Sequence, residues 1–262
     1  MSRNESELLF EEYLTSHGYA DFAHDIPVEG KRKKPDYRLE HGGSSLFFAV
    51  KEFDAPLPLP NVSTYDPYEP IREKINQATR QFKEYKDSPC SMVLANPKSA
   101  FGRLTDAWAI LGAILGNLGF TVPIGANAEE TRSTSNVFLA GGKMIDKKRR
   151  RPQNTTVSSI IILGTYPLWQ NQIRLAIKLR ERELGRTTTM DEALTFYEGM
   201  PETPDLRRVR VVVYENPYAR IPLRRGLFCG RFDERWGVEG GVIRRVYVGP
   251  EAVEFEEGLG TE

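Results

Sequence analysis

The sequence predicts an α/β fold, with a central mixed β-sheet flanked by helices and an elaborated C-terminal half. Helix and strand patterns follow one another as helix, hairpin, helix, strand in the first third of the chain, and a mixed sheet with helices on its faces has this order. The 262 residues suffice for one substantial core, and no linker divides them. We therefore expect a single domain over residues 1–262, with a core at 1–97 that residues 98–262 complete or extend.

The N-terminal patterns predict a helix and a β-hairpin. Residues 5–17 are expected to be helical, with apolar side chains on one face; these are Leu9, Phe10, Tyr13 and Leu14. Residues 36–40 and 46–53 predict two strands around a turn at 41–45. The proline-rich residues 54–70 are incompatible with regular structure.

A second helix is expected from Pro70 to about Lys86, because apolar residues recur there at alternating spacings of four and three. These residues are Ile71, Ile75, Ala78, Phe82 and Tyr85. Residues 91–95 predict a short buried strand. Residues 103–118 predict a helix that is apolar nearly all round, and 125–156 are weakly ordered by composition. The remaining expected elements are strands at 157–163, 209–214 and 242–248 and helices at 168–184 and 190–197.

Charge is balanced overall but clustered locally. The formal net charge is zero, so no global basic field indicates a nucleic-acid partner. Two basic runs nevertheless favour a local polyanion contact, with a solvated surface as the alternative. The runs are Lys31, Arg32, Lys33 and Lys34, then Lys147, Lys148, Arg149, Arg150 and Arg151.

Cysteine usage and hydropathy predict a soluble protein in the cytoplasm. Cys90 and Cys229 have neither metal-ligand nor disulfide-framework spacing, which is typical of a reducing compartment. The most apolar window, residues 107–120, is too short to span a bilayer, so no membrane partner is expected.

The strongest chemical signal is Pro35-Asp36 on one predicted strand and Lys51 on the next. Metal-assisted phosphodiester hydrolysis needs carboxylates for a hard cation and a positive charge for the transition state. Strand alternation places Ala49 and Lys51 on one face and Glu52 on the other, so Glu52 replaces a carboxylate at position 49 only if the strand bulges. Asp36 and the Val50 carbonyl are the expected ligands of Mg²⁺ or Mn²⁺.

Two helices offer further candidates for this site. Glu7 and Glu11 flank the apolar face of the first helix, although an ordinary charged helix flank is the alternative for each. On the second helix, Lys74, Gln81 and Tyr85 fall on one edge of the apolar stripe, where they could hold a phosphate or a base.

This order of motifs resembles the PD-(D/E)-x-K nuclease superfamily over residues 5–97. Asp36 and Lys51 correspond to its strand motifs, Gln81 and Tyr85 to the third motif of its exonuclease-like branch, and Glu7 to a helix-1 Glu of some members. The resemblance implies a restriction-endonuclease-like fold and a metal-dependent nuclease acting on DNA or RNA. The departure is Ala49, where the family has Asp or Glu. An inactivating replacement, a non-cutting relative and a migrated carboxylate would each account for it.

Two other functions compete with a nuclease impaired at position 49. The first is a non-catalytic subunit that binds nucleic acid or assembles with other chains while keeping the nuclease fold. The second is a protein-interaction scaffold, either a homo-oligomer or a protein partner bound through the C-terminal half. Its aromatic residues in turn-rich segments suggest this role: Tyr218, Phe228, Phe232 and Trp236. The spacing of His17, His24 and His41 does not indicate a zinc site.

Overall fold

The computed structural model contains one eight-stranded mixed sheet flanked by helices. It describes residues 3–25, 34–53, 68–96, 107–116, 118–121, 135–138, 141–146, 151–166, 176–177, 179–199, 208–239, 242–250 and 252. The named helices are α1 (Glu5–Ser16), α2 (Glu69–Phe82), α3 (Ala107–Leu115) and α5 (Met190–Glu198). The expected α/β class is confirmed.

Within the described residues, ten strands accompany these helices. They are β1 (Phe22–His24), β2 (Tyr37–His41), β3 (Ser44–Glu52), β4 (Cys90–Ala95), β5 (Leu118–Thr121), β6 (Ser135–Phe138), β7 (Val157–Tyr166), β8 (Arg208–Glu215), β9 (Glu234–Glu239) and β10 (Val242–Val248). The large sheet has the order β1-β2-β3-β4-β7-β8-β9-β10, while β5 and β6 form a separate hairpin. Strands from both halves of the chain thus share one sheet.

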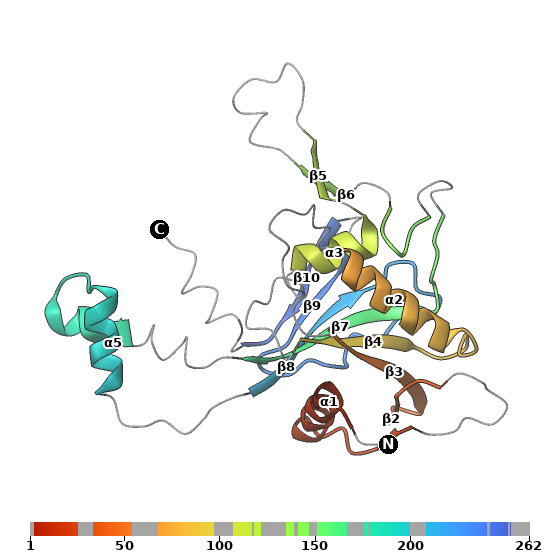
Figure 1. The fold of residues 1–262 in the computed structure, drawn as a ribbon, viewed down its shortest axis with the longest axis horizontal. Coiled ribbons are helices and arrows are strands. Elements are labelled where there is room, and N and C mark those ends of the chain that lie inside the picture. Colours follow the sequence, from red (N-terminus) through yellow and green to blue (C-terminus); the bar gives the residue numbers. More distant parts are fainter. Residues whose placement is uncertain are drawn as a thin grey trace, which may run out of the picture.

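Helix α1 covers one face of this sheet, and helices α2 and α3 cover the other (Figure 1). On one face, α1 buries Phe10, Tyr13 and Leu14 against β2, β3, β7 and β8. On the other, α2 and α3 form a second core layer that contains Ala49 of β3. Pairing is antiparallel from β1 to β3 and parallel from β3 through β4 to β7. The sheet is therefore mixed, as expected.

Local chemistry explains where two of the helices begin. Asn4 caps α1 through a capping box, in which its side chain accepts a hydrogen bond from Glu7 N and the Glu7 carboxylate accepts one from Asn4 N. Pro70 lies in the first turn of α2, where the absence of an N–H costs no hydrogen bond. A hydrogen bond from Ser6 Oγ to Glu52 Oε2 (2.8 Å) then places the N-terminal end of α1 beside β3.

Several predicted boundaries were wrong. Helix α2 ends at Phe82 rather than Lys86, so Tyr85 lies beyond it. Helix α3 ends at Leu115, because Gly116 leaves the helix with a φ of 125°, a conformation open mainly to glycine. Strands β1 and β9 were not expected, and part of the region expected to be weakly ordered forms β6. Among the described residues, no helix has the length and apolar content needed to cross a membrane.

Candidate active site

Asp36 is held by backbone contacts on both sides at the point where β2 begins. Its N–H donates to Phe48 O (2.8 Å), and its carbonyl accepts from Asp25 N (2.9 Å). Pro35 before it is buried, which fixes the entry of the chain into β2. The backbone therefore aims the Asp36 side chain at β3, on which Lys51 lies.

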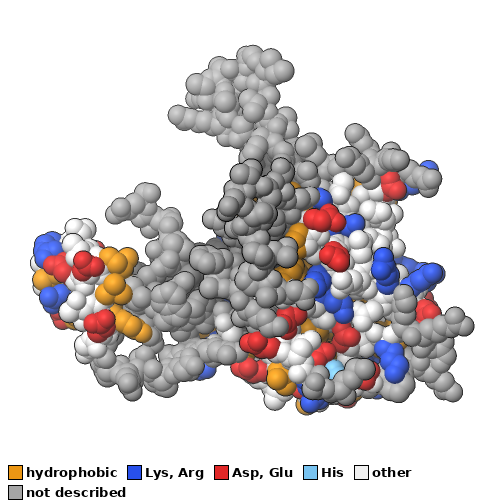
Figure 2. All heavy atoms as spheres, viewed as in Figure 1, with side chains coloured by type: hydrophobic (Ala, Val, Ile, Leu, Met, Phe, Trp, Pro, Cys, Tyr) orange, Lys and Arg blue, Asp and Glu red, His pale blue; other side chains and the backbone are white. Residues whose placement is uncertain are grey.

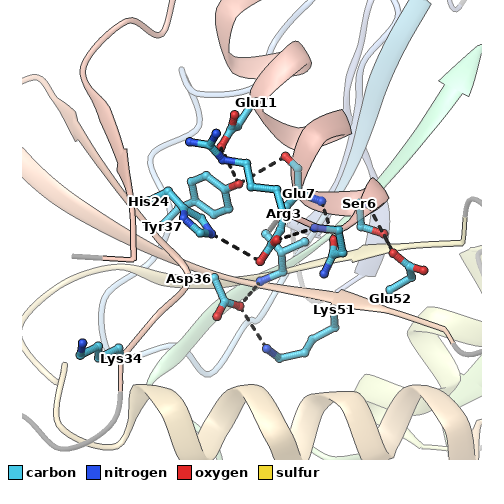
Figure 3. A network of polar contacts seen from close by, with 12 residues as sticks. Arg3, Ser6, Glu7, Glu11, His24, Lys34, Asp36, Tyr37, Lys51 and Glu52 are labelled. Carbon is cyan, nitrogen blue, oxygen red and sulfur yellow. Dashed lines mark hydrogen bonds and ion pairs between the residues drawn. The ribbon is translucent and has the colours of Figure 1, made fainter. Parts of the chain in front are cut away.

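The Asp36 carboxylate joins three elements of the fold (Figure 3). Its Oδ2 accepts hydrogen bonds from Val50 N (2.8 Å) and Lys51 Nζ (3.1 Å), both on β3. Its Oδ1 accepts one from Gln81 Nε2 (3.2 Å) on α2. Lys51 from the strand motif and Gln81 from the separate helix pattern thus meet at the Asp36 carboxylate. The side chains of Asp36 and Lys51 are only 23% and 15% exposed, so solvent screens their ion pair less than an ordinary surface pair.

Strand β3 separates its side chains as alternation predicts. Ala49 is fully buried in the layer under α2 and α3. Glu52 turns to the opposite face, where its Oε2 accepts hydrogen bonds from Ser6 Oγ (2.8 Å) and Ser6 N (3.4 Å) at the start of α1. Pairing of β3 with β4 continues without a bulge from Phe47 through Glu52. Glu52 therefore does not replace a carboxylate at position 49.

Gln81 holds the loop before β2 as well as Asp36. Its Nε2 also donates to Lys34 O (3.2 Å), so one amide group spans the approach to Asp36. Its Oε1 is buried and has no hydrogen-bond partner within the described part of the chain. This acceptor faces neither Lys34 O nor Asp36, since two oxygens would repel each other there.

The other two α2 candidates have different surroundings from Gln81. Tyr85 is 1% exposed and packs its ring on Phe47, with centroids 4.6 Å apart. Burial is also the main reason that the pKa of Tyr85 lies above its usual value, followed by the nearby charge of Glu84. Tyr85 is thus part of the core layer. Lys74 is half-buried on α2, two turns before Gln81.

Glu7 and Glu11 lie on the α1 side of the sheet in a polar network of their own (Figure 3). The Glu7 carboxylate caps α1 and lies 3.5 Å from His24 Nε2 of β1. The Glu11 Oε1 accepts from Arg3 Nε (2.6 Å) and from the Tyr37 hydroxyl (2.8 Å). Burial, and then the hydrogen bond to Glu11, raises the pKa of Tyr37 well above its usual range.

Sequence reasoning did not select the partners in this network. Arg3, Ser6, His24 and Tyr37 each contact a carboxylate of α1 or β3. Of these four residues, the position of Tyr37 could have been predicted. It follows Asp36 directly, so strand alternation places its side chain on the opposite face of the sheet, toward α1. The other three depend on contacts between distant segments, which a single sequence does not record.

The basic candidates fall mostly outside the described residues. Lys31, Arg32 and Lys33 lie there, as do Lys147, Lys148, Arg149 and Arg150. Lys34 is exposed two residues before Asp36, and Arg151 is exposed, with its carbonyl accepting a hydrogen bond from Asp146 N (2.9 Å). Lys34 is thus the basic candidate whose backbone lies near Asp36, because Gln81 Nε2 donates to both Lys34 O (3.2 Å) and Asp36 Oδ1 (3.2 Å).

The aromatic residues of the C-terminal turns are mainly buried locally. Phe228 is fully buried with a φ of 56°, and its ring lies 5.8 Å from that of Phe48. Trp236 stacks on Tyr214 at 6.3 Å. Tyr218 is 36% exposed. Phe228 is thus a core residue, and Trp236 is half-buried and packs against the core.

The donor set at Asp36 does not fit a divalent cation in the chain as it stands. Hard cations take six or more oxygen ligands, with carboxylates prominent among them. Here Asp36 already accepts three hydrogen bonds, and position 49 offers a methyl group. The Val50 carbonyl leaves β3 on the same edge as its N–H, toward Asp36, and so adds one oxygen. The described residues contain no group of three His, Cys, Asp or Glu side chains that could hold a metal.

Comparison of the chain with protein-family models, with curated proteins and with solved structures gave no match.

Proposed function

We propose that this chain is a metal-dependent nuclease in its architecture, with phosphodiester hydrolysis impaired by Ala49. One observation carries the proposal: Lys51 of β3 and Gln81 of α2 both donate hydrogen bonds to Asp36, which directly precedes β2. Their arrangement supports the resemblance to the PD-(D/E)-x-K superfamily and its restriction-endonuclease-like fold. So does the order α1, β1, β2, β3, α2, β4, with the two helices on opposite faces.

Each side chain has a role that its position allows. Asp36 and a carboxylate at position 49 would hold Mg²⁺ or Mn²⁺, which would polarise the phosphoryl group and activate water. Lys51 lies where a fixed positive charge can offset the negative charge that develops on the phosphate oxygens. Gln81 orients Asp36 from the opposite side, and Lys34 attracts the polyanion.

The test restores the missing carboxylate. Position 49 shares a face with Lys51, and the antiparallel pairing of Tyr37 with Phe48 brings it opposite Asp36, so the side chain of Ala49→Glu extends toward Asp36. We expect this variant to cleave DNA or RNA only with Mg²⁺ or Mn²⁺, measured by release of labelled fragments from single- and double-stranded substrates. The matched control is Ala49→Gln, which has the same size without the charge and is expected to remain inactive. Failure of the folded Ala49→Glu variant on every substrate would refute the proposal.

A non-catalytic nucleic-acid-binding subunit is the second candidate. The Lys51 ammonium neutralises Asp36, and position 49 adds no negative charge, so little in the site repels a phosphate. Under this function the unmodified chain binds nucleic acid in the presence of a chelator. Affinity falls with salt, and each lost phosphate contact reduces the logarithmic salt slope by roughly 0.9.

The basic runs provide the measurement for this candidate. Replacing Lys31, Arg32, Lys33 and Lys34 together by Ser should lower both the affinity and the salt slope in a fluorescence-anisotropy titration. The same replacement of Lys147, Lys148, Arg149, Arg150 and Arg151 tests the other run. Unchanged binding in both variants would exclude this mode of recognition.

A further inference from the structure

The charges around Asp36 cancel locally. The Lys51 ammonium lies 3.1 Å from Asp36 Oδ2, and the two side chains are largely shielded from water. The other two donors, Val50 N and Gln81 Nε2, are uncharged. Asp36 and Lys51 together therefore carry a net charge of zero, and the carboxylate has a permanent cationic partner on its own sheet.

Three other carboxylates that the structure describes on α1 and β3 are directed elsewhere. Glu52 is hydrogen-bonded to Ser6 on the α1 face, Glu7 to the start of α1, and Glu11 to Arg3 and Tyr37. Each would have to give up these partners and cross to the α2 face to reach Asp36 and Lys51. Position 49 is on the correct face but holds a methyl group. Among the described carboxylates of α1, β3 and the start of β2, the negative charge accessible to a cation on the α2 face is thus that of Asp36, and Lys51 already pairs with it.

We propose that Lys51 is a built-in counter-ion that occupies the place of a divalent cation at Asp36. The absence of a carboxylate at position 49 is then only part of the reason that the site does not fit a metal. The other part is direct competition, because a dication approaching Asp36 must displace the Lys51 ammonium or tolerate it at close range. This inference rests on the proposed function, in which Asp36 is the metal-facing carboxylate.

The positive charge of Lys51 has opposite effects on phosphate binding and on cation binding at this site. A positive charge at position 51 favours a phosphate at the site but opposes a cation, and a second carboxylate at position 49 allows both to be present. With Glu at 49 the local charge becomes −1 while Lys51 is retained. Removing the Lys51 charge from the Ala49 chain also gives −1. The two changes should therefore produce a similar gain in cation affinity by different routes.

The experiment measures Mn²⁺ binding to the full chain by electron paramagnetic resonance of free Mn²⁺, without substrate. Lys51→Met, which keeps the side-chain length and removes the charge, should bind Mn²⁺ roughly tenfold more tightly than the unmodified chain. Lys51→Arg keeps the charge and should bind no better than the unmodified chain. Lys83→Met is the matched control for loss of one positive charge, because Lys83 is exposed at the end of α2.

Each outcome decides the question. Tighter binding in Lys51→Met alone supports the counter-ion role. Equal binding in Lys51→Met and the unmodified chain overturns it, and so does an equal gain in Lys83→Met, which would reflect net charge. Thermal melting verifies that the variants are folded, and the additional variant Lys51→Gln repeats the test if Lys51→Met is unstable.

This measurement is separable from the test of the proposed function. Cleavage by Ala49→Glu together with unchanged Mn²⁺ binding in Lys51→Met would retain the nuclease and remove the counter-ion role. Tighter Mn²⁺ binding in Lys51→Met together with an inactive Ala49→Glu variant would retain the counter-ion role of Lys51 and reject the nuclease.

Discussion

Asp233 illustrates at the residue scale how this fold stabilises a fully buried carboxylate. Its oxygens accept hydrogen bonds from the Tyr13 hydroxyl, Gly230 N and Val211 N. A buried charge is tolerated only with such partners, because transfer from water would otherwise be very costly. Tyr13 lies on α1, so one side-chain contact ties the first helix to the segment between β8 and β9.

Removing this contact should destabilise the whole chain. Tyr13→Phe deletes the hydroxyl and leaves Asp233 with one partner fewer, which typically costs about 1–3 kcal/mol. The measurement is the free energy of unfolding in urea. Tyr218→Phe removes a hydroxyl from a side chain that is 36% exposed and should change the free energy far less. Equal effects of the two variants would contradict the assigned role of Asp233.

The folded chain should lose stability at high pH because of two buried tyrosines, Tyr13 and Tyr37. Burial, together with Asp233 for Tyr13 and Glu11 for Tyr37, raises the pKa of both hydroxyls in the folded state. Because the unfolded groups titrate near 10, the stability that the neutral hydroxyls provide is complete below about pH 10 and is lost as pH rises further. Absorbance at the tyrosinate band should therefore increase together with loss of the circular dichroism signal. Ionisation of both groups in a fully folded chain would disprove this coupling.

At the element scale, α5 is a local unit whose start depends on its cap. The Thr189 side chain accepts a hydrogen bond from Glu192 N, and the Glu192 carboxylate accepts one from Thr189 N (3.0 Å). Hydrogen bonds from Arg186, followed by the one from Thr189 N, lower the pKa of Glu192 to about 2. The capping box therefore remains intact at mildly acidic pH.

Loss of the cap should loosen α5 without affecting the sheet. Thr189→Ala is expected to cost about 1 kcal/mol locally. Hydrogen exchange of the α5 amides should accelerate, while that of β4 and β7 stays unchanged. Thr195→Ala is the control, because the Thr195 hydroxyl donates to Asp191 O within the helix and caps no free N–H. Acceleration of equal size in the control would argue against the cap.

The elements that sequence patterns missed have physical reasons for being missed. Strand β1 has only three residues, too few for a pattern to emerge. Strand β9 reads Glu-Arg-Trp-Gly-Val-Glu, and its Arg235 is fully buried because Glu215 pairs with it from β8. Such a burial of charge depends on a partner 20 residues away and is not visible as hydrophobic alternation.

The site was more predictable than these strands. Alternation alone placed Ala49 with Lys51 and directed Glu52 away, as the contacts of Glu52 with Ser6 show. Tyr85 was misplaced as a helical residue, because an apolar stripe does not reveal the turn at which a helix ends. The links from α1 to β1 and β2 required the tertiary fold.

At the scale of the whole molecule, the sheet joins both halves of the chain. Strand β4 from the first half pairs along its length with β7 from the second. Helix α1 packs on β3 and also on β7 and β8, through residues such as Phe10 and Tyr13. The segment that carries the nuclease-like motifs is therefore part of a larger core.

Residues 1–97 alone should consequently fail to fold. The fragment would expose β4 as an open edge and would lack β7 and β8, on which α1 packs. We expect a circular dichroism spectrum without a cooperative thermal transition, in contrast with the full chain. A cooperative transition in the fragment would show that the motif-bearing core is autonomous.

The turn between β2 and β3 has a consequence for the distant site. Gly42 and Gly43 form this turn with φ values of 56° and 72°, and Arg224 donates to Gly42 O and to Ser44 Oγ from far along the chain. A hairpin that slipped by one residue would exchange the two faces of β3 and direct Lys51 toward α1. The hydrogen bonds of Arg224 to this turn therefore favour the observed register of β2 and β3. A substitution of Arg224 would thus act on the groups around Asp36 through the register of the hairpin, because Arg224 contacts the turn and not Asp36.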